Sequence, residues 1–592
     1  MRYITFKCSL LAVVAASAAH GGTVSPQLAG MNPGQKVQVI VQYSPSIPGL
    51  LRSPVCDVLS LVNLLPGGEL CSMPAAAAIR LGQKAAVGHV SVNNPILGAG
   101  LSALSGYDYM PQTTQPGNAH AGIPDADAGK NIGVAVIDSG IAINRDLIGN
   151  SSANWPASVI PQVAYAESFV PGEGVDDYYG HGTHIAGIIA GNGSNSSGSA
   201  YLHDIHGVAP GAHLISLKVL DRNGQSTDAA VIQAIDRAIQ LKAAYNIKVI
   251  NLSLGRPIYE SYKNDPLCQE VEKAWRSGIT VVVAAGNAGR SNGAGTNGYS
   301  TIMAPGNDPL ALTVGAMNTE STPQRGDDLM TTYSSKGPSL GDHIVKPDLV
   351  AAGNKIFSIL DPGSTLATED ASSIASPASY IASPAPGQTS GYMILSGTSM
   401  AAGVTSGAAA VLLAQQNLTP DQVKARLMKT ASKTFPETSV ITDPNTGQTF
   451  TIQYDIFTVG AGYLDLSAAL ASSDSIPEYM NAASPVAVPA GTDSSGHTLV
   501  HVVNDSSQSA VWGSSAVWGS STVWGSSTVW GSSAWSGDST VWGSSTVWGS
   551  STVWGSGTDS GYSTVWGSGT VWGSSTVWGS STVWGSCTLS DN

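Results

Sequence analysis

Five short apolar runs between residues 133 and 314 do not alternate polar with apolar side chains. The first reads GVAVID at 133–138, and the others occupy 214–220, 248–252, 279–285 and 311–314. A strand of this kind is apolar on both faces, so both faces must be covered, as they are in a parallel sheet. This requirement narrows the choice of folds more than any other feature of the chain.

The segments between these runs are predicted to be helices. Residues 228–245 carry apolar side chains at three- and four-residue steps, the spacing of one helix face. Strands that alternate with helices predict an α/β fold, in which helices cover both faces of a parallel sheet. Functional groups then belong at the carboxyl ends of the strands, where Asp138 and Ser253 stand.

Three segments carry the residue types of nucleophilic catalysis. Asp138-Ser139-Gly140 follows the first strand, Gly180-His181-Gly182-Thr183-His184 opens an apolar helix, and Gly397-Thr398-Ser399-Met400-Ala401 opens another. A serine hydroxyl is a weak nucleophile, so it needs a base, a group that orients the base, and donors for the oxyanion. Taken singly, these residues have plainer interpretations: a turn, a structural histidine and a helix cap. Their conjunction favours catalysis.

Together the three segments resemble the subtilase family of serine peptidases, in which the chain order is Asp, His, Ser. Four further segments resemble that family's oxyanion-hole segment, its substrate-binding strand, the segment leading toward the nucleophile and the closing segment. They are Ala284-Ala285-Gly286-Asn287, Ser253-Leu254-Gly255, Lys346–Gly353 and Gly460–Asp465. The resemblance spans residues 115–472 and implies a catalytic domain with a subtilisin-like parallel sheet.

The resemblance implies a role for each catalytic residue. Ser399 Oγ attacks the scissile carbonyl, His181 takes the serine proton and later donates it to the leaving amine, and Asp138 holds the imidazole in one tautomer. Asn287 donates its side-chain amide to the oxyanion, with the Ser399 N–H as second donor. His184 is a packing residue in this interpretation, because no carboxylate stands beside it at metal-ligand spacing.

Substrate binding is assigned to main-chain groups and small residues. Ser253, Leu254 and Gly255 would bind an extended peptide as an added strand, and Ala285 and Gly286 leave room for a sizeable apolar side chain. Protein or peptide substrates and broad specificity are expected. The chemistry requires no cofactor. Members of the family often bind structural calcium, but no compact Asp-rich loop here specifies a site, so metal ligands are left unassigned.

One position departs from the family pattern. Family members usually continue the nucleophile segment with Pro-His-Val, whereas Ala402 is followed here by Gly403-Val404-Thr405. Glycine lacks the rigidity of proline, and its helix propensity lies about 1 kcal/mol below that of alanine. Because Gly403 lies a turn beyond Ser399, we expect altered packing and intact chemistry. Before the nucleophile, a Ser-, Ala- and Pro-rich loop is expected at 371–390.

The N-terminal residues predict a secreted zymogen. Residues 1–19 combine basic residues, an apolar run and a small-residue end, the form of a secretory signal peptide. Within residues 30–96, strand patterns at 36–43 and 87–93 enclose an Ala-rich helical pattern at 75–86, which predicts a small α+β unit. In secreted subtilases such a unit is an inhibitory propeptide that is removed autocatalytically, here between about 96 and 118. A permanent accessory domain is the alternative.

Composition narrows the classes of partner. Only 11% of the residues are charged, 26 basic against 40 acidic, which argues against a nucleic-acid-binding surface. No apolar run after the signal reaches the roughly 20 residues that span a bilayer, so the chain is expected to be extracellular, in solution or attached to the cell surface.

After removal of the signal, Cys56, Cys71, Cys268 and Cys587 remain. Cys56 and Cys71 are near each other in sequence, but three connectivities stay open.

The tail is a hexapeptide repeat that follows a linker at 473–509. Between residues 510 and 586, Ser-Thr-Val-Trp-Gly-Ser units hold 12 of the 14 tryptophans, and 11 of them keep one six-residue register. An even period puts these tryptophans on one face of an extended strand. This predicts a stacked β-array for self-association or for attachment to a surface or polymer. A β-prone but unordered low-complexity tail is the alternative.

Two functions follow from these patterns. The preferred one is a secreted serine endopeptidase that uses Asp138, His181 and Ser399, with Asn287 in the oxyanion hole, and that processes its own propeptide. The other is a surface-binding or structural protein in which the peptidase-like domain is a scaffold and the tail is the functional part. The complete set of catalytic residues favours the enzyme.

Overall fold

The computed structural model describes most of the chain from residue 22 onward. The predicted signal peptide at 1–19 lies outside the described residues. The chain forms two compact units, Met1–Asn93 and Asn94–Asn592. The described residues are 22–45, 55–57, 61–98, 101–102, 123–148, 162–291, 296–322, 324–436, 438–443, 447–473, 481–492, 498–503 and, in the tail, the strands between 516 and 590.

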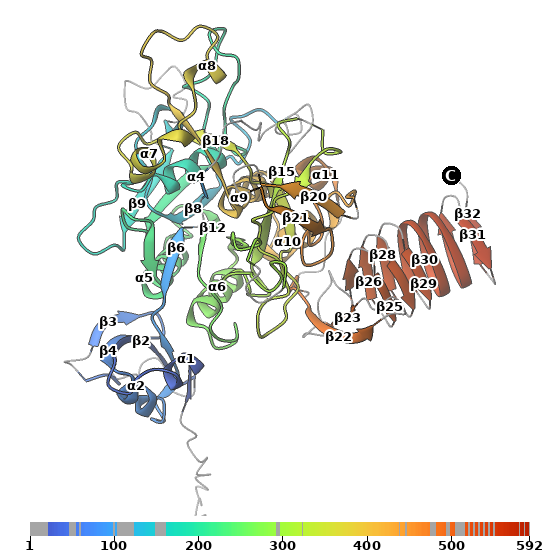
Figure 1. The fold of residues 1–592 in the computed structure, drawn as a ribbon, viewed down its shortest axis with the longest axis horizontal. Coiled ribbons are helices and arrows are strands. Elements are labelled where there is room, and N and C mark those ends of the chain that lie inside the picture. The colour runs from blue at the N-terminus through green and yellow to red at the C-terminus, as the bar shows by residue number, and fades with distance from the viewer. Residues whose placement is uncertain are drawn as a thin grey trace, which may run out of the picture. The chain divides into compact units, whose positions relative to one another are not determined.

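The first unit is a five-stranded sheet with two short helices (Figure 1). Its elements are β1 (Thr23–Val24), α1 (Pro26–Ala29), β2 (Lys36–Tyr43), β3 (Leu61–Leu65), β4 (Gly68–Pro74), α2 (Ala75–Leu81) and β5 (Val87–Val92). The strand order is β1-β5-β2-β4-β3, and only the pair β1 and β5 is parallel. In β2 the alternating residues Val37, Val39 and Val41 are buried, and Ile40 on the opposite face is buried as well. The predicted helix ends earlier than expected, at Leu81, where Gly82 follows.

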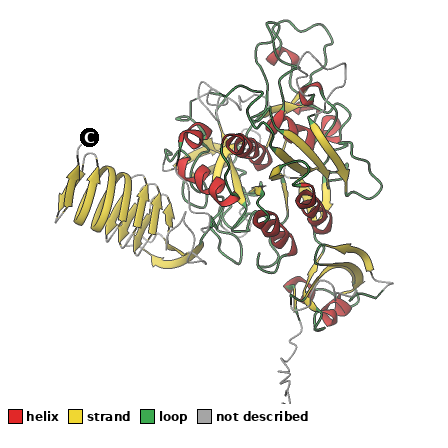
Figure 2. Ribbon diagram, turned by 180° about the vertical axis from the view of Figure 1, so that it is seen from behind, coloured by secondary structure: helices red, strands yellow, loops and turns green. Residues whose placement is uncertain are grey.

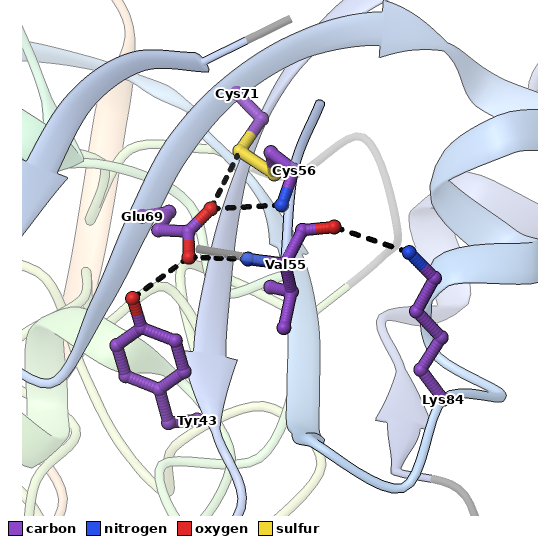
Figure 3. The surroundings of a disulfide bond; sticks show 6 residues. All are labelled: Tyr43, Val55, Cys56, Glu69, Cys71 and Lys84. Carbon is purple, nitrogen blue, oxygen red and sulfur yellow. Dashed lines mark hydrogen bonds between the residues drawn. A yellow bond between two sulfur atoms is a disulfide. The ribbon is translucent and has the colours of Figure 1, made fainter. Parts of the chain in front are cut away.

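A disulfide joins Cys56 and Cys71 in this unit (Figure 3). The buried Glu69 carboxylate beside it accepts hydrogen bonds from Tyr43 Oη at 2.7 Å, from Val55 N–H at 2.7 Å and from Cys56 N–H at 2.9 Å. A buried carboxylate is costly unless donors surround it, and these three donors meet that need. Of the pairings that the sequence left open, the structure forms this one, and Cys268 is a buried free cysteine.

The second unit contains an eight-stranded, almost entirely parallel sheet. Its strands are β8 (Gly133–Asp138), β9 (Val163–Ser168), β10 (His213–Lys218), β12 (Ile247–Leu252), β14 (Thr280–Ala284), β15 (Leu312–Asn318), β16 (Leu329–Met330) and β17 (Leu349–Ala352). Their order is β16-β15-β14-β12-β8-β10-β9, and β17 pairs with β15. Only β15 and β16 are antiparallel. All residues of β8 are buried, so the predicted parallel sheet is confirmed.

Helices cover both faces of this sheet (Figure 1, Figure 2). On one face α4 (His181–Ala190) packs against α9 (Thr398–Gln415), and on the other α5 (Asp228–Leu241) packs against α6 (Pro266–Arg276). None of the described helices has both the length and the apolar character needed to cross a bilayer. The other helices among the described residues of this unit are η2 (Arg145–Leu147), α7 (Thr365–Glu369), η3 (Ala371–Ser373), α8 (Pro377–Tyr380), α10 (Pro420–Thr430) and α11 (Leu466–Ala471).

Gly403 lies where α9 packs against α4. A Cβ atom at this position would stand 3.0 Å from Ile188 Cγ2, closer than ordinary van der Waals contact. The missing side chain therefore lets the two helices approach each other closely, at the expense of some helix propensity. The glycine at position 403, where family members usually have proline, thus affects the packing of α9 against α4.

Residues just after the first unit form a strand in the second one. β6 (Pro95–Gly98) lies between β11 (Gln225–Thr227) and β13 (Leu254–Gly255) and is antiparallel to both. The predicted strand at 248–252 begins at Ile247, and β13 follows it after one residue. The segment expected at the end of the propeptide is therefore part of the sheet that holds the predicted substrate-binding strand.

A second small sheet contains the next described residues of the chain. β7 (Leu101–Ser102) is antiparallel to β19 (Tyr392–Ser396), which also pairs with β18 (Ile356–Ile359). Because β19 runs directly into Gly397 and α9, this sheet supports the start of the helix that carries the predicted nucleophile. Two hairpins complete the described fold before the tail: β20 (Thr438–Thr442) with β21 (Thr449–Gln453), and β22 (Val486–Thr492) with β23 (Thr498–Val503).

The tail strands pair in parallel at a step of twelve residues. Trp518 is opposite Trp530, which is opposite Trp542, and Trp542 is opposite Trp554. One step thus comprises two hexapeptide units, so every second unit belongs to the same ladder. The elements are β24 (Ala516–Trp518), β25 (Ser521–Trp524), β26 (Ser527–Trp530), β27 (Ser533–Ser536), β28 (Ser539–Trp542), β29 (Ser545–Trp548), β30 (Ser551–Trp578), β31 (Ser581–Trp584) and β32 (Cys587–Ser590).

Candidate active site

Asp138 and His181 meet at the carboxyl edge of the central sheet. Asp138 is the last residue of β8, and His181 is the first residue of α4. His181 Nδ1 lies 2.8 Å from Oδ1 and 3.0 Å from Oδ2 of Asp138, and both side chains are buried. Gly182 permits this approach, because a Cβ atom there would overlap the carbonyl oxygen of Gly140.

The start of α4 is held by the Asp177 carboxylate. It accepts hydrogen bonds from Gly180 N–H at 2.7 Å, from Thr183 N–H at 2.8 Å and from Thr183 Oγ1 at 2.6 Å. Such N–H groups have no partner within the helix itself. Gly180 has φ = 99°, a left-handed conformation that suits glycine. Together these contacts determine the position of His181.

The surroundings of His181 favour its charged form. Burial lowers the pKa of its imidazole, but the charge of Asp138, the hydrogen bond to Asp138 and the charge of Asp177 together outweigh burial, so the net shift of the pKa is upward. The Nε2 atom has no hydrogen-bond partner among the residues that the structure describes. The imidazole is therefore anchored through Nδ1, and Nε2 is the nitrogen that remains for proton transfer.

Ser399 lies in the first turn of α9 and is buried. Its Oγ donates a hydrogen bond to the Ser253 carbonyl at 3.2 Å, and Ser253 Oγ donates to the Ser399 carbonyl at 3.0 Å. The structure thus joins the predicted nucleophile to the predicted substrate-binding segment, while the hydroxyl points to Ser253 and not to His181. Hydrogen bonds between nucleophile and base often form only when substrate is bound.

Asn287 is joined to the turn that carries the nucleophile. Its Oδ1 accepts hydrogen bonds from the N–H and from Oγ1 of Thr398, both at 3.0 Å. Gly286 N–H also donates to Thr398 Oγ1 at 3.0 Å, and the preceding Ala285 donates its N–H to Val314 of β15. Because Oδ1 acts as acceptor, the Nδ2 end of the amide is the donor end, the polarity that an oxyanion hole requires.

The predicted substrate-binding strand pairs with a segment of its own chain. Leu254 is opposite Gly98, and Gly255 is opposite Leu97, in the antiparallel pair of β13 and β6. Ile96 is fully buried, whereas Leu97 is 57% exposed, so successive side chains of β6 point to opposite faces. Main-chain groups expected to bind an added peptide strand thus pair with residues 97 and 98, while residues 95 and 96 pair with β11.

Met303 occupies part of the space that the sequence suggested for a substrate side chain. A Cβ atom on Gly286 would lie 2.8 Å from Met303 Cγ, and one on Gly255 would lie 3.1 Å from Met303 Cβ. The expectation of room for a sizeable apolar group beside Ala285 and Gly286 rested on those residues alone. A methionine from a distant loop reduces this room.

The chain continues on the other side of Ser399. Leu101 is opposite Ser396 and Ser102 is opposite Leu395 in the pair of β7 and β19, and β19 ends three residues before Ser399. β6 therefore lies beside the segment that follows Ser253, and β7 lies beside the strand that leads into the nucleophile helix. The two strands bracket Ser399 along one continuous stretch of chain.

His184 belongs to the core and not to the reaction. Its Nε2 is 3.2 Å from the Ile356 carbonyl oxygen, and the side chain is fully buried. Burial is the main cause that lowers the pKa of His184 to about 3, and the neighbouring His181 lowers it further. The imidazole is therefore neutral at physiological pH, which suits a packing residue.

The cluster of possible metal ligands among the described side chains does not suit calcium. Among the described residues, one group of cysteine and carboxylate side chains converges closely enough to hold a metal ion, namely Cys56, Glu69 and Cys71. Its two sulfurs form a disulfide and are not thiolates (Figure 3). The Glu69 oxygens already accept hydrogen bonds from Tyr43 and Val55. We therefore assign no calcium site.

Three residues of the site were not identified from the sequence. Asp177 stands four residues before His181, and Thr398 lies inside the nucleophile segment, so capping and turn patterns contained a signal for both. Met303 carried no such signal, because its proximity to Gly255 and Gly286 is created only by the tertiary fold.

Comparison with known proteins identifies the family. A model described as the subtilase family matches residues 129–454. Serine protease AprX of Bacillus subtilis is 35% identical over 327 residues, which are 54% of this chain and 64% of AprX, slightly less than two thirds of that relative. Thermitase of Thermoactinomyces vulgaris is 32% identical over 332 residues, 56% of this chain and 90% of thermitase. Subtilisin DY of Bacillus licheniformis is 32% identical over 306 residues, which are 51% of this chain and 85% of subtilisin DY. Because the family model covers more than half of the 592 residues, the chain belongs to the subtilase family of serine peptidases.

Proposed function

We propose that this protein is a secreted serine endopeptidase that hydrolyses proteins and peptides and is made as a zymogen that cuts itself. The proposal rests above all on the buried Asp138 and His181 pair, 2.8 Å apart, in a chain whose Ser399 lies in the buried first turn of a helix. The first unit, which contains residues 30–93, is the proposed propeptide and the enzyme's own inhibitory partner. Subtilases need no cofactor for catalysis, so the chemistry rests on side chains and main-chain donors.

In the proposed mechanism Ser399 Oγ turns from Ser253 toward His181 Nε2, which takes the hydroxyl proton as the oxygen attacks the scissile carbonyl. Asp138 accepts the hydrogen bond from Nδ1–H and stabilises the imidazolium. Asn287 Nδ2 and the Ser399 N–H donate to the tetrahedral oxyanion at the start of α9. His181 then donates its proton to the leaving amine. A water molecule attacks the acyl-enzyme by the same steps, which releases the second product and restores Ser399.

Self-processing is supported by the segment that brackets the nucleophile. The two strands leave three peptide bonds between Gly98 and Leu101, a stretch of at most about 11 Å between these Cα atoms. The bond between Ala99 and Gly100 is the middle one of these three in the sequence. We therefore propose that the bond between Ala99 and Gly100 is cut. A small residue before the cut agrees with the reduced space beside Met303.

Mapping the N-terminus of the processed protein tests this proposal. Full-length protein is expected to yield a mature chain that begins at Gly100 and hydrolyses casein, because the bond between Ala99 and Gly100 lies between the two bracketing strands. Intact-mass spectrometry measures the cut. Replacing Leu101 by proline should delay the cut, because proline has no N–H and disfavours the pairing of β7 with β19, whereas proline at the exposed Leu340 should not. A first cut outside residues 98–101 would contradict the assignment.

Replacing Asn287 by alanine is expected to lower kcat about 10²–10³-fold, the loss known for the corresponding donor of subtilisin, while KM changes little. The amide acts on the oxyanion, which exists only in the transition state and intermediate, so substrate binding is spared. Steady-state kinetics on a peptide substrate measures both constants. Asn264→Ala, outside the site, serves as control. If kcat/KM fell by the same factor through a higher KM alone, with kcat unchanged, Asn287 would bind substrate and would not stabilise the oxyanion.

Secretion and attachment complete the proposal. The signal-like residues 1–19 support export. The ladder that pairs every second unit of the tail supports a β-array for self-association or for attachment to a cell surface or polymer. In the alternative function, the tail acts alone and the peptidase-like domain is an inactive scaffold.

A further inference from the structure

A buried ion cluster lies directly after the strand that pairs with β6. Arg256 follows β13, and only 2% of this residue is exposed. Its Nε lies 2.7 Å from Asp228 Oδ1, and its Nη2 lies 2.8 Å from both oxygens of Asp265. Both aspartates are fully buried. Two carboxylates thus share one guanidinium, so further hydrogen-bond donors are needed for the remaining negative charge.

Those donors come from main-chain groups on either side. Asp265 Oδ1 accepts the N–H of Leu267 and caps helix α6. The other oxygen of Asp228, Oδ2, accepts the N–H of Asn94 at 3.1 Å, and the Asp228 N–H donates to the Asn94 carbonyl at 3.0 Å. Both bonds to Asn94 use only its main-chain atoms. The buried Asp228 carboxylate therefore binds a peptide N–H of the segment that leads into β6, the strand paired with the predicted substrate-binding strand β13.

These bonds extend the β6 and β11 ladder beyond its last pair. Pro95 is opposite Thr227 at the end of that ladder, and Asn94 and Asp228 are the next residues along the two segments. Pro95 has no N–H, so Asn94 is the first residue upstream of Ile96 that can donate one. The Asp228 carboxylate stands where that N–H arrives.

We propose that Asp228 is a specificity-determining residue that binds the main chain of the sixth residue before the cut. The inference rests on the proposed function, with a cut between Ala99 and Gly100 that makes Asn94 the sixth residue. Arg256 and Asp265 are positioning residues, because they act by holding Asp228. The enzyme therefore prefers peptides with at least six residues before the cut and an N–H at the sixth, whatever side chain that residue carries.

The test uses the processed enzyme and three acetylated peptides. The first has the sequence of residues 94–102, and the second that of 95–102. In the second, the acetyl group keeps a carbonyl for the Asp228 N–H but offers no N–H to the carboxylate. The third peptide equals the first except for an N-methylated asparagine. For the wild-type enzyme, kcat/KM is expected to be about 10- to 100-fold higher for the first peptide than for the second or the third. This is the range expected for a hydrogen bond to a charged group.

An enzyme variant separates recognition from a structural role. Asp228→Ala is expected to bring the ratio of kcat/KM between the first and second peptides to about one, whereas loss of packing alone would lower all rates and keep the ratio. Asp236→Ala, on the same helix and ion-paired with Lys273 at 2.5 Å, should keep the wild-type ratio. The peptide comparison on wild-type enzyme is decisive even when Asp228→Ala does not fold.

The possible failures can be told apart. If the wild-type enzyme cleaves all three peptides with equal kcat/KM, the role of Asp228 is wrong and the peptidase function stands. If a wild-type chain neither processes itself nor cleaves any of the peptides or casein, the proposed function is wrong, and this inference falls with it.

Discussion

The Ser399→Ala protein is expected to have a kcat lowered by a factor of about 10⁶, which is the loss known for removal of the nucleophile in subtilisin, a relative of this chain. It is also expected to remain uncut between Ala99 and Gly100. Alanine removes the attacking oxygen and leaves the buried start of α9 otherwise unchanged, so folding should be retained. Casein hydrolysis and the intact mass of the purified chain measure the two effects.

Two controls give this experiment its meaning. Ser379→Ala, at a half-buried position of α8, should be as active and as fully processed as the wild type. Uncut Ser399→Ala protein mixed with mature wild-type enzyme should be cut at the same bond, which would show that the substrate segment is intact. If wild type and Ser399→Ala are equally inactive and equally unprocessed, the peptidase proposal is wrong and the scaffold alternative is favoured.

The second large effect is expected for Asp138→Asn, with kcat lowered by about 10⁴. The asparagine keeps the shape of the side chain but presents an amide to His181 Nδ1, 2.8 Å from Oδ1 in the native site. The imidazole is then no longer held with its proton on Nδ1, and the imidazolium loses its counter-charge. Steady-state kinetics on a peptide substrate measures the loss, with the exposed Asp127→Asn variant as control.

The same variant should also change the pH dependence. His181 must be neutral at Nε2 to accept the serine proton, so kcat/KM rises as the pH rises through the His181 pKa. In the native site Asp138 raises this pKa against the effect of burial. Without that charge the pKa falls, and the midpoint of the acidic limb should move to lower pH. An unchanged midpoint, measured between about pH 4 and pH 9, would show that Asp138 does not control the base.

Much of the catalytic unit could be predicted because its signals are local. β8 lies in a run without polar alternation, and that pattern alone requires cover on both faces of the sheet. Asp138 stands at the end of that strand, and His181 and Ser399 stand at helix starts, so short motifs indicated where each would lie. The central strands deviate from their predicted bounds by a few residues, because strand ends depend on neighbouring strands.

Other parts of the site depend on contacts between residues far apart in the chain. Asp228 looks like an ordinary helix start in the sequence, and its bonds to Arg256 and Asn94 join three separate segments. Likewise, the hydroxyl of Ser399 points to the Ser253 carbonyl, 146 residues away. No short pattern encodes such a pairing, because many residues can supply a donor or an acceptor and only the packed core decides which of them meet.

The sequence by itself therefore determined the parallel sheet and the family, and it supplied the residue types of the proposed triad, since periodicity and motif order are properties of short stretches of chain. The tertiary structure alone decided the Cys56 and Cys71 pairing, the position of Met303 and the pairing of β6 and β7 with segments next to Ser253 and Ser399. These features depend on bringing together residues that are far apart in the chain, and on pairing each buried polar group with a hydrogen-bond partner. Neither is determined until the whole chain is packed.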